Sequence, residues 1–256
     1  MRKVQKMEII SQREIARNIF ELVLKGDLVQ AMLVPGQFVN VKVSDMEAPL
    51  LRRPISICNI DYTQNQLTIV YRAEGQGTTI LSKRQPGESV DILGPLGTGY
   101  NLDEIAPDQT VLLVGGGIGV PPMLETSQRL KARGNKVISV LGFASQPDVF
   151  YEDKFAQQGE VHIATMDGSY GFAGNVVELI KKNAIDFDVV LGCGPKVMLK
   201  AIEDSFGDTH KGYLSFEERM ACGIGACYAC VCQTKSGKQA RICKEGPVFP
   251  LGEVVL

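Results

Sequence analysis

Three cysteines share one short loop near the carboxyl end of the chain, and a fourth follows them. In the segment Cys222-Gly-Ile-Gly-Ala-Cys227-Tyr-Ala-Cys230, four and then two residues separate successive cysteines, and Cys243 comes thirteen residues later. This spacing is typical of cysteines that hold a [2Fe–2S] cluster, which carries out one-electron chemistry. The small residues between them let the backbone turn tightly and bring amide groups near the sulfur atoms. We therefore predict that Cys222, Cys227, Cys230 and Cys243 are metal ligands.

Two other uses of clustered cysteines fit this pattern less well. Structural zinc sites usually pair two short cysteine hooks that lie far apart. Disulfide bonds are disfavoured because the cysteine count of seven is odd and the first residues lack the apolar segment of an export signal. Cys232 offers an alternative third or fourth ligand, although one intervening residue is awkward for a single cluster. Cys243 comes much earlier than the fourth cysteine of plant ferredoxins does.

The overall composition is that of an ordinary globular protein. The chain has 256 residues, of which 45% are hydrophobic and 22% charged, and its net charge is −2. This balance favours neither nucleic acid nor a charged membrane surface as a partner. The longest uncharged stretch, residues 109–124, contains four glycines and two prolines, so it is unsuited to crossing a bilayer. We expect a cytoplasmic protein.

The first hundred residues have the pattern of an antiparallel β barrel. Apolar and polar residues alternate over residues 38–43, 67–72 and 90–93, and glycine–proline turns separate these stretches. One helix is expected, over residues 78–84. Many short strands with such turns are typical of a small closed barrel.

After Asp108, apolar strands alternate with helical patterns, which predicts a parallel sheet covered on both faces. The expected strands are 111–114, 136–141, 161–164 and 189–191, and the expected helices are 122–132, 148–158, 175–183 and 195–206. The sequence thus divides into a barrel (1–101), an α/β domain (102–211) and a small cysteine-rich domain (212–256).

Three loops that follow strands of the predicted sheet could bind a dinucleotide. The first contains Gly115, Gly116, Gly117 and Gly119 and leads into a helix, so that backbone amides and the helix dipole could face a pyrophosphate. The second is Gly192-Cys193-Gly194, and the third spans residues 165–171. All three would lie at the carboxyl edge of the sheet, where ligands bind in such folds. Tight packing and ordinary turn chemistry explain each loop taken alone nearly as well.

The order of barrel, nucleotide-type domain and ferredoxin-like tail resembles the ferredoxin–NADP reductase superfamily. The matching segments are Arg53-Pro54-Ile55-Ser56, Val70-Tyr71-Arg72 and Gly75-Gln-Gly77-Thr78-Thr79. The resemblance implies that all three contact FAD. Arg53 would bind the pyrophosphate, Ser56 would lie at the reactive N5 edge of the flavin, and the third segment would cradle the phosphates. Ile55 stands where a stacking tyrosine is common, so that stack is lost or supplied from elsewhere.

Within this superfamily the chain closely resembles the electron-transfer subunits of the bacterial NAD-dependent (type B) dihydroorotate dehydrogenases. The residues that carry this closer match are Leu51–Ser56, Tyr71–Thr78, Gly115–Pro122 and Glu217–Cys227, and the match runs over essentially the entire chain. It implies FAD, one [2Fe–2S] cluster and NAD as co-substrate. It also implies a catalytic partner subunit that carries FMN, in a heterotetramer of two plus two subunits. Electrons would pass from dihydroorotate through FMN, the cluster and FAD to NAD, in de novo pyrimidine biosynthesis, and Cys193 and Gly194 would lie near the nicotinamide.

The chain by itself looks catalytically incomplete. Oxidation of dihydroorotate needs a base, yet His162 and His210 are its only histidines, and we expect neither to lie beside a carboxylate or a nucleophile motif. No catalytic residue is therefore predicted. Related reductase subunits, such as those of ferredoxin–NADP transhydrogenases and sulfhydrogenases, share the three-part layout and are the nearest alternative. A cluster-bearing redox sensor without flavin is a further alternative, and it would lack flavin absorbance.

Overall fold

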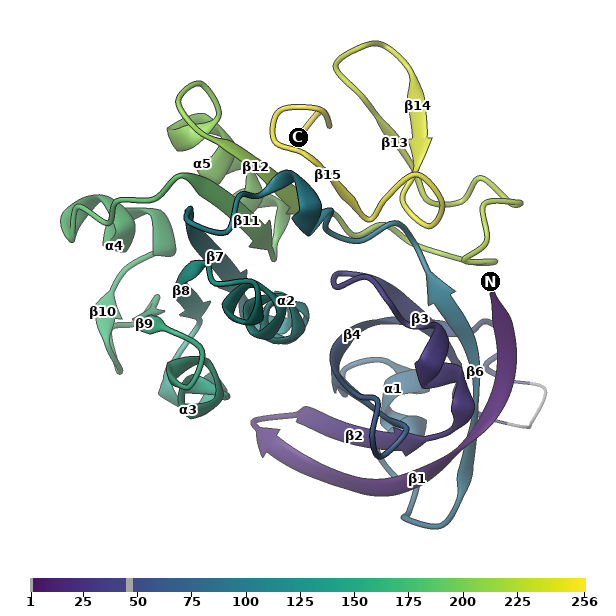
Figure 1. The fold of residues 1–256 in the computed structure, drawn as a ribbon. Helices are drawn as coiled ribbons and strands as arrows, with labels where there is room; N and C mark the ends of the chain where they lie inside the picture. Colours follow the sequence, from purple (N-terminus) through teal and green to yellow (C-terminus); the bar gives the residue numbers. More distant parts are fainter. Residues whose placement is uncertain (1, 45–47) are drawn as a thin grey trace.

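The computed structural model describes residues 2–44 and 48–256, and in it six strands close into an antiparallel barrel in the order β1-β2-β5-β4-β3-β6 (Figure 1). The predicted barrel is therefore confirmed. Val39 and Val41 point into its core, while Phe38 and Asn40 face outward towards the tail. The strands are β1 (Lys3–Ala16), β2 (Ile19–Lys25), β3 (Phe38–Lys42), β4 (Arg53–Asp61), β5 (Gln66–Arg72) and β6 (Ser89–Leu96). The helices of this part are η1 (Asp27–Ala31), α1 (Gln76–Leu81) and η2 (Leu102–Glu104).

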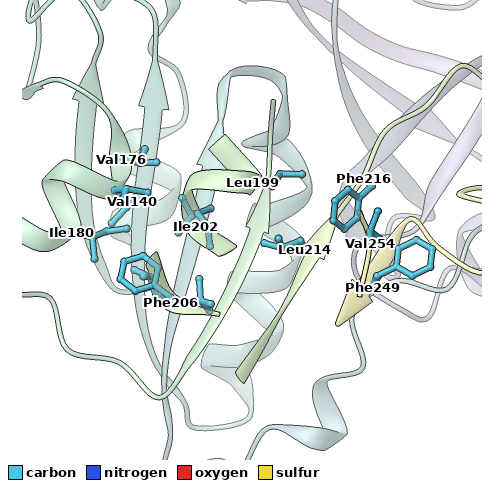
Figure 2. Packing of buried hydrophobic residues seen from close by; sticks show 14 of the residues in the cluster. Val140, Val176, Ile180, Leu199, Ile202, Phe206, Leu214, Phe216, Phe249 and Val254 are labelled. Carbon is cyan, nitrogen blue, oxygen red and sulfur yellow. The ribbon is translucent and has the colours of Figure 1, made fainter. Parts of the chain in front are cut away.

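The second part is a sheet with the strand order β10-β9-β8-β7-β11-β12-β15, parallel except for β15. Apolar residues of α2 and α3 pack on one face and those of α4 and α5 on the other, as predicted. Figure 2 shows the second of these faces, where Ile180 and Ile202 lie over Val140. The elements before the tail are β7 (Thr110–Gly116), η3 (Gly117–Gly119), α2 (Pro121–Ala132), β8 (Lys136–Phe143), η4 (Gln146–Asp148), α3 (Glu152–Ala156), β9 (Glu160–Thr165), β10 (Phe172–Ala173), α4 (Val176–Lys182), β11 (Val189–Cys193) and α5 (Lys196–Phe206).

Two predicted helices differ from the observed ones. The helix expected over residues 148–158 is a 3-10 turn, η4, followed by the short helix α3, because Tyr151 between them adopts a left-handed conformation with φ of 66°. The helix expected over residues 78–84 begins earlier, at Gln76, and ends at Leu81. The apolar pattern marks neither the left-handed residue nor the exact ends of a helix.

The tail contributes strands to the second sheet and also contacts the barrel. Its strands are β12 (Lys211–Ser215), β13 (Val231–Gln233), β14 (Gln239–Arg241) and β15 (Val248–Pro250). β12 pairs with β11, and β15 pairs with β12, while β13 and β14 form a separate hairpin. Phe38 and Leu96 of the barrel share a hydrophobic core with Phe216 and Phe249 of the tail. The tail thereby joins the two larger parts, and its cysteine-rich segment lies over the end of the barrel (Figure 1).

Among the described residues, no helix is both long and apolar enough to cross a membrane.

Candidate functional site

A cavity of about 270 Å³ lies where the barrel, the first glycine loop and the tail meet. The predicted flavin residues converge on it from two barrel strands and one helix. They are Arg53, Pro54, Ile55 and Ser56 of β4, Val70, Tyr71 and Arg72 of β5, and Thr78 of α1. The remaining lining residues are Phe38, Ile118, Ser215, Phe216, Glu217, Glu218, Met220 and Pro247.

The sequence analysis did not predict that residues of the tail line this cavity. Ser215, Phe216 and Pro247 come from the ends of β12 and β15, which the sequence pattern did not predict as strands. Glu217 and Met220 belong to a segment that carried the family resemblance, and this was a signal that could have identified them. Glu217 is exposed, and partial desolvation beside the cavity raises the pKa of its carboxyl group.

Arg53 is held against a glycine. A Cβ atom at Gly77 would lie 2.4 Å from Nε of Arg53, so only glycine leaves space for the guanidinium beside the start of α1. The Thr78 hydroxyl donates a hydrogen bond to the carbonyl of Gly75 (3.1 Å), which shapes the same turn. A guanidinium next to a glycine turn suits the pyrophosphate of a dinucleotide. These residues therefore fit the predicted flavin.

Tyr71 and Ile55 line the cavity, but both side chains belong mainly to the barrel core. The Tyr71 hydroxyl donates to Oε1 of Gln12 (2.8 Å), its ring stacks on Phe20 at 5.9 Å, and burial raises its pKa. Ile55 is 7% exposed and packs with the same core. From the tail, the aromatic residue Phe216 also lines the cavity.

A second cavity, of about 280 Å³, adjoins the first through Arg72, Ile118 and Glu217, which line both. Its other lining residues are Gly116, Gly117, Gly119, Gly194, Pro195, Lys196 and Leu199. The first two glycine loops thus meet, as predicted from their places at one sheet edge. A Cβ at Gly119 would lie 2.3 Å from the carbonyl oxygen of Cys193, so close packing between the loops also requires glycine.

Cys193 and Gly115 lie behind this cavity rather than in its lining. Cys193 is 2% exposed, and burial raises the pKa of its thiol to about 12, so the sulfur is neutral at physiological pH. A Cβ at Gly115 would touch the backbone of Val120 at 3.0 Å. Both residues shape the loops that face the cavity.

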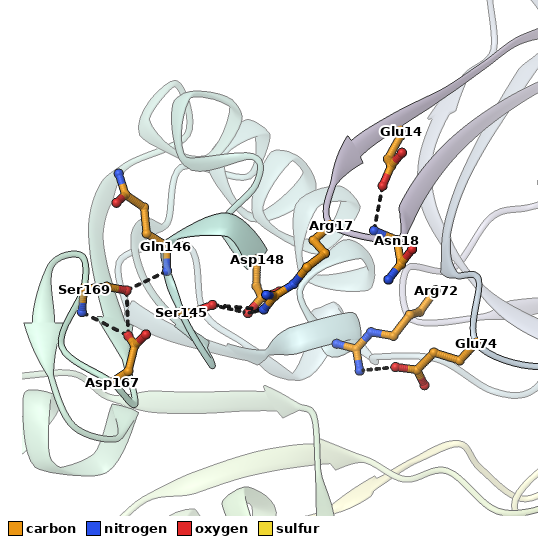
Figure 3. A network of polar contacts seen from close by, with 10 residues as sticks. All are labelled: Glu14, Arg17, Asn18, Arg72, Glu74, Ser145, Gln146, Asp148, Asp167 and Ser169. Atoms are coloured by element: carbon orange, nitrogen blue, oxygen red, sulfur yellow. Dashed lines mark hydrogen bonds and ion pairs between the residues drawn. The ribbon is translucent and has the colours of Figure 1, made fainter.

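The third loop, residues 165–171, lines none of the three cavities described here and is hydrogen-bonded instead to the segment that follows β8 (Figure 3). The Ser169 hydroxyl accepts a hydrogen bond from the backbone amide of Gln146 (2.8 Å). The Asp167 carboxylate accepts one from the backbone amide of Ser169. Nearby, Arg17 of the barrel makes a bidentate ion pair with Asp148, at 2.8 Å to each carboxylate oxygen. Arg17 and Asp148 also line a third cavity, of about 230 Å³, that contains Arg72 and Gly117.

The two histidines lie outside the lining of these three cavities. Nε2 of His162 lies 2.8 Å from Oε1 of Glu160, so the prediction that it has no carboxylate neighbour is wrong. Residues two apart on a strand face the same side, which explains the pair. His210 stacks on Phe187 at 4.3 Å.

Backbone amides converge on three of the predicted cluster ligands. The amides of Ile224 and Ala226 donate to Sγ of Cys222, at 3.5 and 3.3 Å. The Gly225 amide donates to Sγ of Cys243 (3.1 Å), and the Cys243 amide donates to Sγ of Cys230 (3.4 Å). Such donors stabilise anionic sulfur and tune the potential of a bound cluster.

The thiols of the four cysteines affect one another. Cys227 lowers the pKa of the Cys222 thiol, whereas Cys230 and Cys222 raise that of Cys243. Within residues 2–44 and 48–256, no three metal-ligating side chains are grouped around a single ion position. A [2Fe–2S] cluster would take all four cysteines as ligands, and their spacing along the chain favours it over zinc. Cys232 lies on β13.

The pKa of Cys222 fits the role of a thiolate ligand. Burial raises it, but the amides of Ile224, Cys227 and Ala226 and the Cys227 thiol outweigh burial and lower it to about 6. The Cys243 thiol has a pKa of about 12, raised by burial and by its neighbour Cys230. Within the chain alone, Cys222 is therefore the more acidic thiol of the two.

Comparison with known proteins places this site in a family. Residues 3–100 match the family model of the oxidoreductase FAD-binding domain, and residues 217–255 match that of the iron-sulfur cluster binding domain of dihydroorotate dehydrogenase B. The chain is 55% identical over 260 residues to a protein of Bacillus mycoides (strain KBAB4) named dihydroorotate dehydrogenase B (NAD(+)), electron transfer subunit, and the match covers 100% of both chains. The chain belongs to the family of dihydroorotate dehydrogenase B electron transfer subunits.

Solved structures of ferredoxin reductases share the fold of this chain. An NADH-dependent reduced ferredoxin–NADP oxidoreductase, described in work on flavin-based electron bifurcation, superposes with a TM-score of 0.87 at 28% identity, covering 98% of this chain and 90% of that one. A ferredoxin NADP+ reductase from Neisseria gonorrhoeae with bound FAD and NADP has a TM-score of 0.69 at 17% identity, covering 82% and 92% respectively, and shares the fold. The predicted family, FAD-binding domain and iron–sulfur domain are confirmed.

Proposed function

We propose that this chain is the electron-transfer subunit of a cytoplasmic, NAD-dependent dihydroorotate dehydrogenase that serves pyrimidine biosynthesis. The observation that carries the proposal is the shared lining of two adjoining cavities, one with the flavin residues and one with the glycine loops, by Arg72 and Glu217. The segment after Glu217 leads directly into the cysteine loop. A nucleotide at the glycine loops, a flavin beside Arg53 and a cluster at the cysteine loop would therefore lie one after another along a single path for electrons.

Each part of the chain has a separate task in this proposal. Residues 1–101 hold FAD, with Arg53 and Thr78 at its phosphates and Ser56 at its reactive edge. Residues 102–211 hold NAD against the loops that contain Gly117 and Gly194. Residues 212–256 hold a [2Fe–2S] cluster. When bound, the cluster exchanges single electrons and FAD exchanges pairs with the nicotinamide, which suits a relay between a flavin partner and NAD.

The partner is a catalytic subunit that carries FMN and oxidises dihydroorotate, in an assembly of two subunits of each kind. Two apolar side chains of the cysteine loop support a docking surface there. Ile224 is 40% exposed and Tyr228 is 60% exposed, and they flank Cys227. Exposed apolar residues around a ligand loop suit a partner that must approach the cluster closely.

Reconstitution tests this proposal. The purified chain should reduce an artificial acceptor with NADH but form no orotate from dihydroorotate. Adding the FMN-bearing subunit should restore dihydroorotate-dependent reduction of NAD, and a Cys222→Ser chain should not support it. Orotate formation by this chain alone would contradict the proposal, and full activity with the cluster-free variant would remove the cluster from the path.

The structural likeness to the ferredoxin–NADP oxidoreductase favours a second candidate, a reductase subunit that exchanges electrons with ferredoxin. The two candidates differ in the partner. NADH-dependent reduction of ferredoxin by the complex purified from its host, without dihydroorotate turnover, would favour the second.

A further inference from the structure

Asn40 is a buried polar side chain for which the chain supplies no partner. It lies on the barrel strand β3 and is 0% exposed. Neither Nδ2 nor Oδ1 of its carboxamide makes a hydrogen bond within the described residues. Burial of an unsatisfied amide destabilises the folded chain, so a group absent from the polypeptide is the expected partner.

The tail is what buries this side chain. Strand β3 points Val39 and Val41 into the barrel, and therefore points Asn40 outward, where a polar residue would ordinarily meet water. Instead the cysteine loop covers it. A Cβ atom at Gly223 would lie 2.3 Å from Nδ2 of Asn40, so the amide nitrogen sits directly against the residue that follows Cys222. Gly223 has φ of 69°, which also favours glycine.

Three backbone amides of the cysteine loop already have partners. The amides of Ile224 and Ala226 donate to Sγ of Cys222, and the Gly225 amide donates to Sγ of Cys243. Nη1 of Arg52 donates to the backbone carbonyl of Asn40 and leaves its side chain untouched. The acceptors that the loop gathers are cysteine sulfurs, and a bound cluster would add sulfide. An amide N–H is a suitable donor to anionic sulfur.

We propose that Nδ2 of Asn40 donates a hydrogen bond to a sulfur on the Cys222 side of the cluster, and that this bond raises the reduction potential of the cluster. The inference rests on the proposed [2Fe–2S] site. A donor to sulfur stabilises the reduced, more negative state more than the oxidised state, so its loss lowers the potential. Asn40 acts as a positioning residue because it also orients the cysteine loop.

The place of Asn40 in the barrel extends this role to the flavin. Strand β3 pairs with β4, where Asn40 lies opposite Pro54 and Phe38 lies opposite Ser56. The strand that carries the amide therefore borders the cavity of the flavin residues. One hydrogen bond from this strand would set the distance between the cluster loop and the flavin cavity. Asn40 therefore ties the barrel to the tail at the point where electrons must cross.

The test is a redox titration of the full chain, loaded with FAD and cluster and assembled with its catalytic subunit. Asn40→Leu keeps the side-chain size and removes both polar atoms, whereas Asn40→Asp keeps the shape and replaces the donor with a carboxylate. We expect the potential to fall in the order wild type, Leu, Asp, with at least a tenfold change in the ratio of reduced to oxidised cluster for Leu, about 59 mV for a one-electron couple. The EPR g-values of the reduced cluster should shift as well.

Ser139→Ala is a matched control, because Ser139 is also a buried polar residue without a partner but lies on β8 in the second sheet. It should leave the potential and the g-values unchanged. A lower melting temperature with unchanged potential and g-values in both Asn40 variants would overturn the inference, since that pattern indicates a purely structural amide. Absence of iron from the wild-type chain would instead overturn the proposed function.

The unsubstituted protein provides a test that does not depend on variant folding. Pulsed EPR of the reduced cluster, in protein grown with asparagine labelled at the amide nitrogen, should show a hyperfine coupling to that nitrogen. An absent coupling would overturn the inference even if both variants failed to fold.

Discussion

At the scale of single residues, the site depends on side chains whose neighbours are glycines or backbone amides. Arg53 fits only beside Gly77, and Cys222 is made acidic by amides of its own loop. An added methyl group at Gly77 would displace the Arg53 guanidinium, and loss of an amide donor would make Cys222 less acidic. Substitutions there should therefore remove a bound group before they unfold the chain.

The cysteine assignments give the first prediction. Replacing Cys222, Cys227, Cys230 or Cys243 individually with serine should abolish cluster retention, because the cluster would lose one of its four thiolate ligands. Cys232→Ser should keep the cluster, and so should Cys58→Ser, since Cys58 is fully buried where β4 packs against the α/β domain and its thiol has a pKa of about 12. Iron content and visible absorbance measure the outcome. Cluster loss in Cys232→Ser together with retention in Cys243→Ser would contradict the assignment.

The second prediction concerns Arg53. Arg53→Ala should lower FAD occupancy about tenfold at limiting FAD, because a charge-assisted contact with phosphate contributes roughly 1.5–3 kcal/mol. Arg52→Ala is the neighbouring control, since Arg52 forms an ion pair with Asp91 (2.8 Å) on the barrel surface. Flavin fluorescence after gel filtration reports the occupancy. Full occupancy in Arg53→Ala would show that another residue holds the pyrophosphate.

At the scale of elements, short contacts between the barrel and the α/β domain determine the shape of the cleft. Glu21 on β2 is 6% exposed, accepts hydrogen bonds from Arg13 (2.8 Å) and from Lys154 (2.9 Å), and also accepts one from Tyr151. Lys154 belongs to α3 and Tyr151 precedes it, so this carboxylate joins two parts of the fold. On α2, the Glu125 carboxylate accepts a bond from the Ile60 amide of β4 (3.0 Å).

The third prediction follows from the pKa of Glu21. Burial raises it, but the bonds from Tyr151, Lys154 and Arg13 outweigh burial and lower it from 4.5 to about 2. A carboxyl group whose pKa is depressed in the folded state stabilises that state fully above about pH 4.5, and this contribution is lost as pH falls towards 2. Glu21→Gln should therefore lower stability by about 1–3 kcal/mol at neutral pH.

Thermal unfolding of the wild-type chain and Glu21→Gln between pH 7 and pH 3 measures this effect, with pH values chosen around the ordinary carboxyl pKa. The difference in melting temperature should shrink as the solution becomes more acidic, because the wild type alone loses the ion pairs. A constant difference across this range would show that Glu21 contributes through packing and not through its charge.

At the scale of the whole molecule, the tail connects the two larger parts. Its strands β12 and β15 extend the second sheet, and its Phe216 shares a core with Phe38 of the barrel. Arg72, at the end of β5, lines all three cavities around the cleft. The groups that we propose for these cavities are thereby held by one connected framework, and the cysteine loop projects from it.

The fourth prediction concerns assembly with the catalytic subunit. Ile224→Lys should weaken the complex at least about tenfold, because a buried charge opposes an apolar interface. The Ile224 backbone amide still donates to Cys222, so the cluster should remain. Leu33→Lys is the control, since Leu33 is 64% exposed before β3 and far from the cysteine loop in sequence. Sedimentation of the mixed subunits measures assembly, and unchanged affinity in Ile224→Lys would place the interface elsewhere.

The sequence by itself determined those features that depend on local spacing. Cysteines four and two residues apart, glycines after an apolar strand and the change from alternating to continuous apolar segments are all readable without tertiary contacts. They predicted the barrel, the parallel sheet and the family. The tertiary structure alone decided which side chains are buried, and against what. Asn40 reads as a solvent-facing residue of an alternating strand until the tail covers it, and β12 and β15 become strands only by pairing with the second sheet. Burial and strand pairing depend on residues far apart in the chain, so no local pattern encodes them.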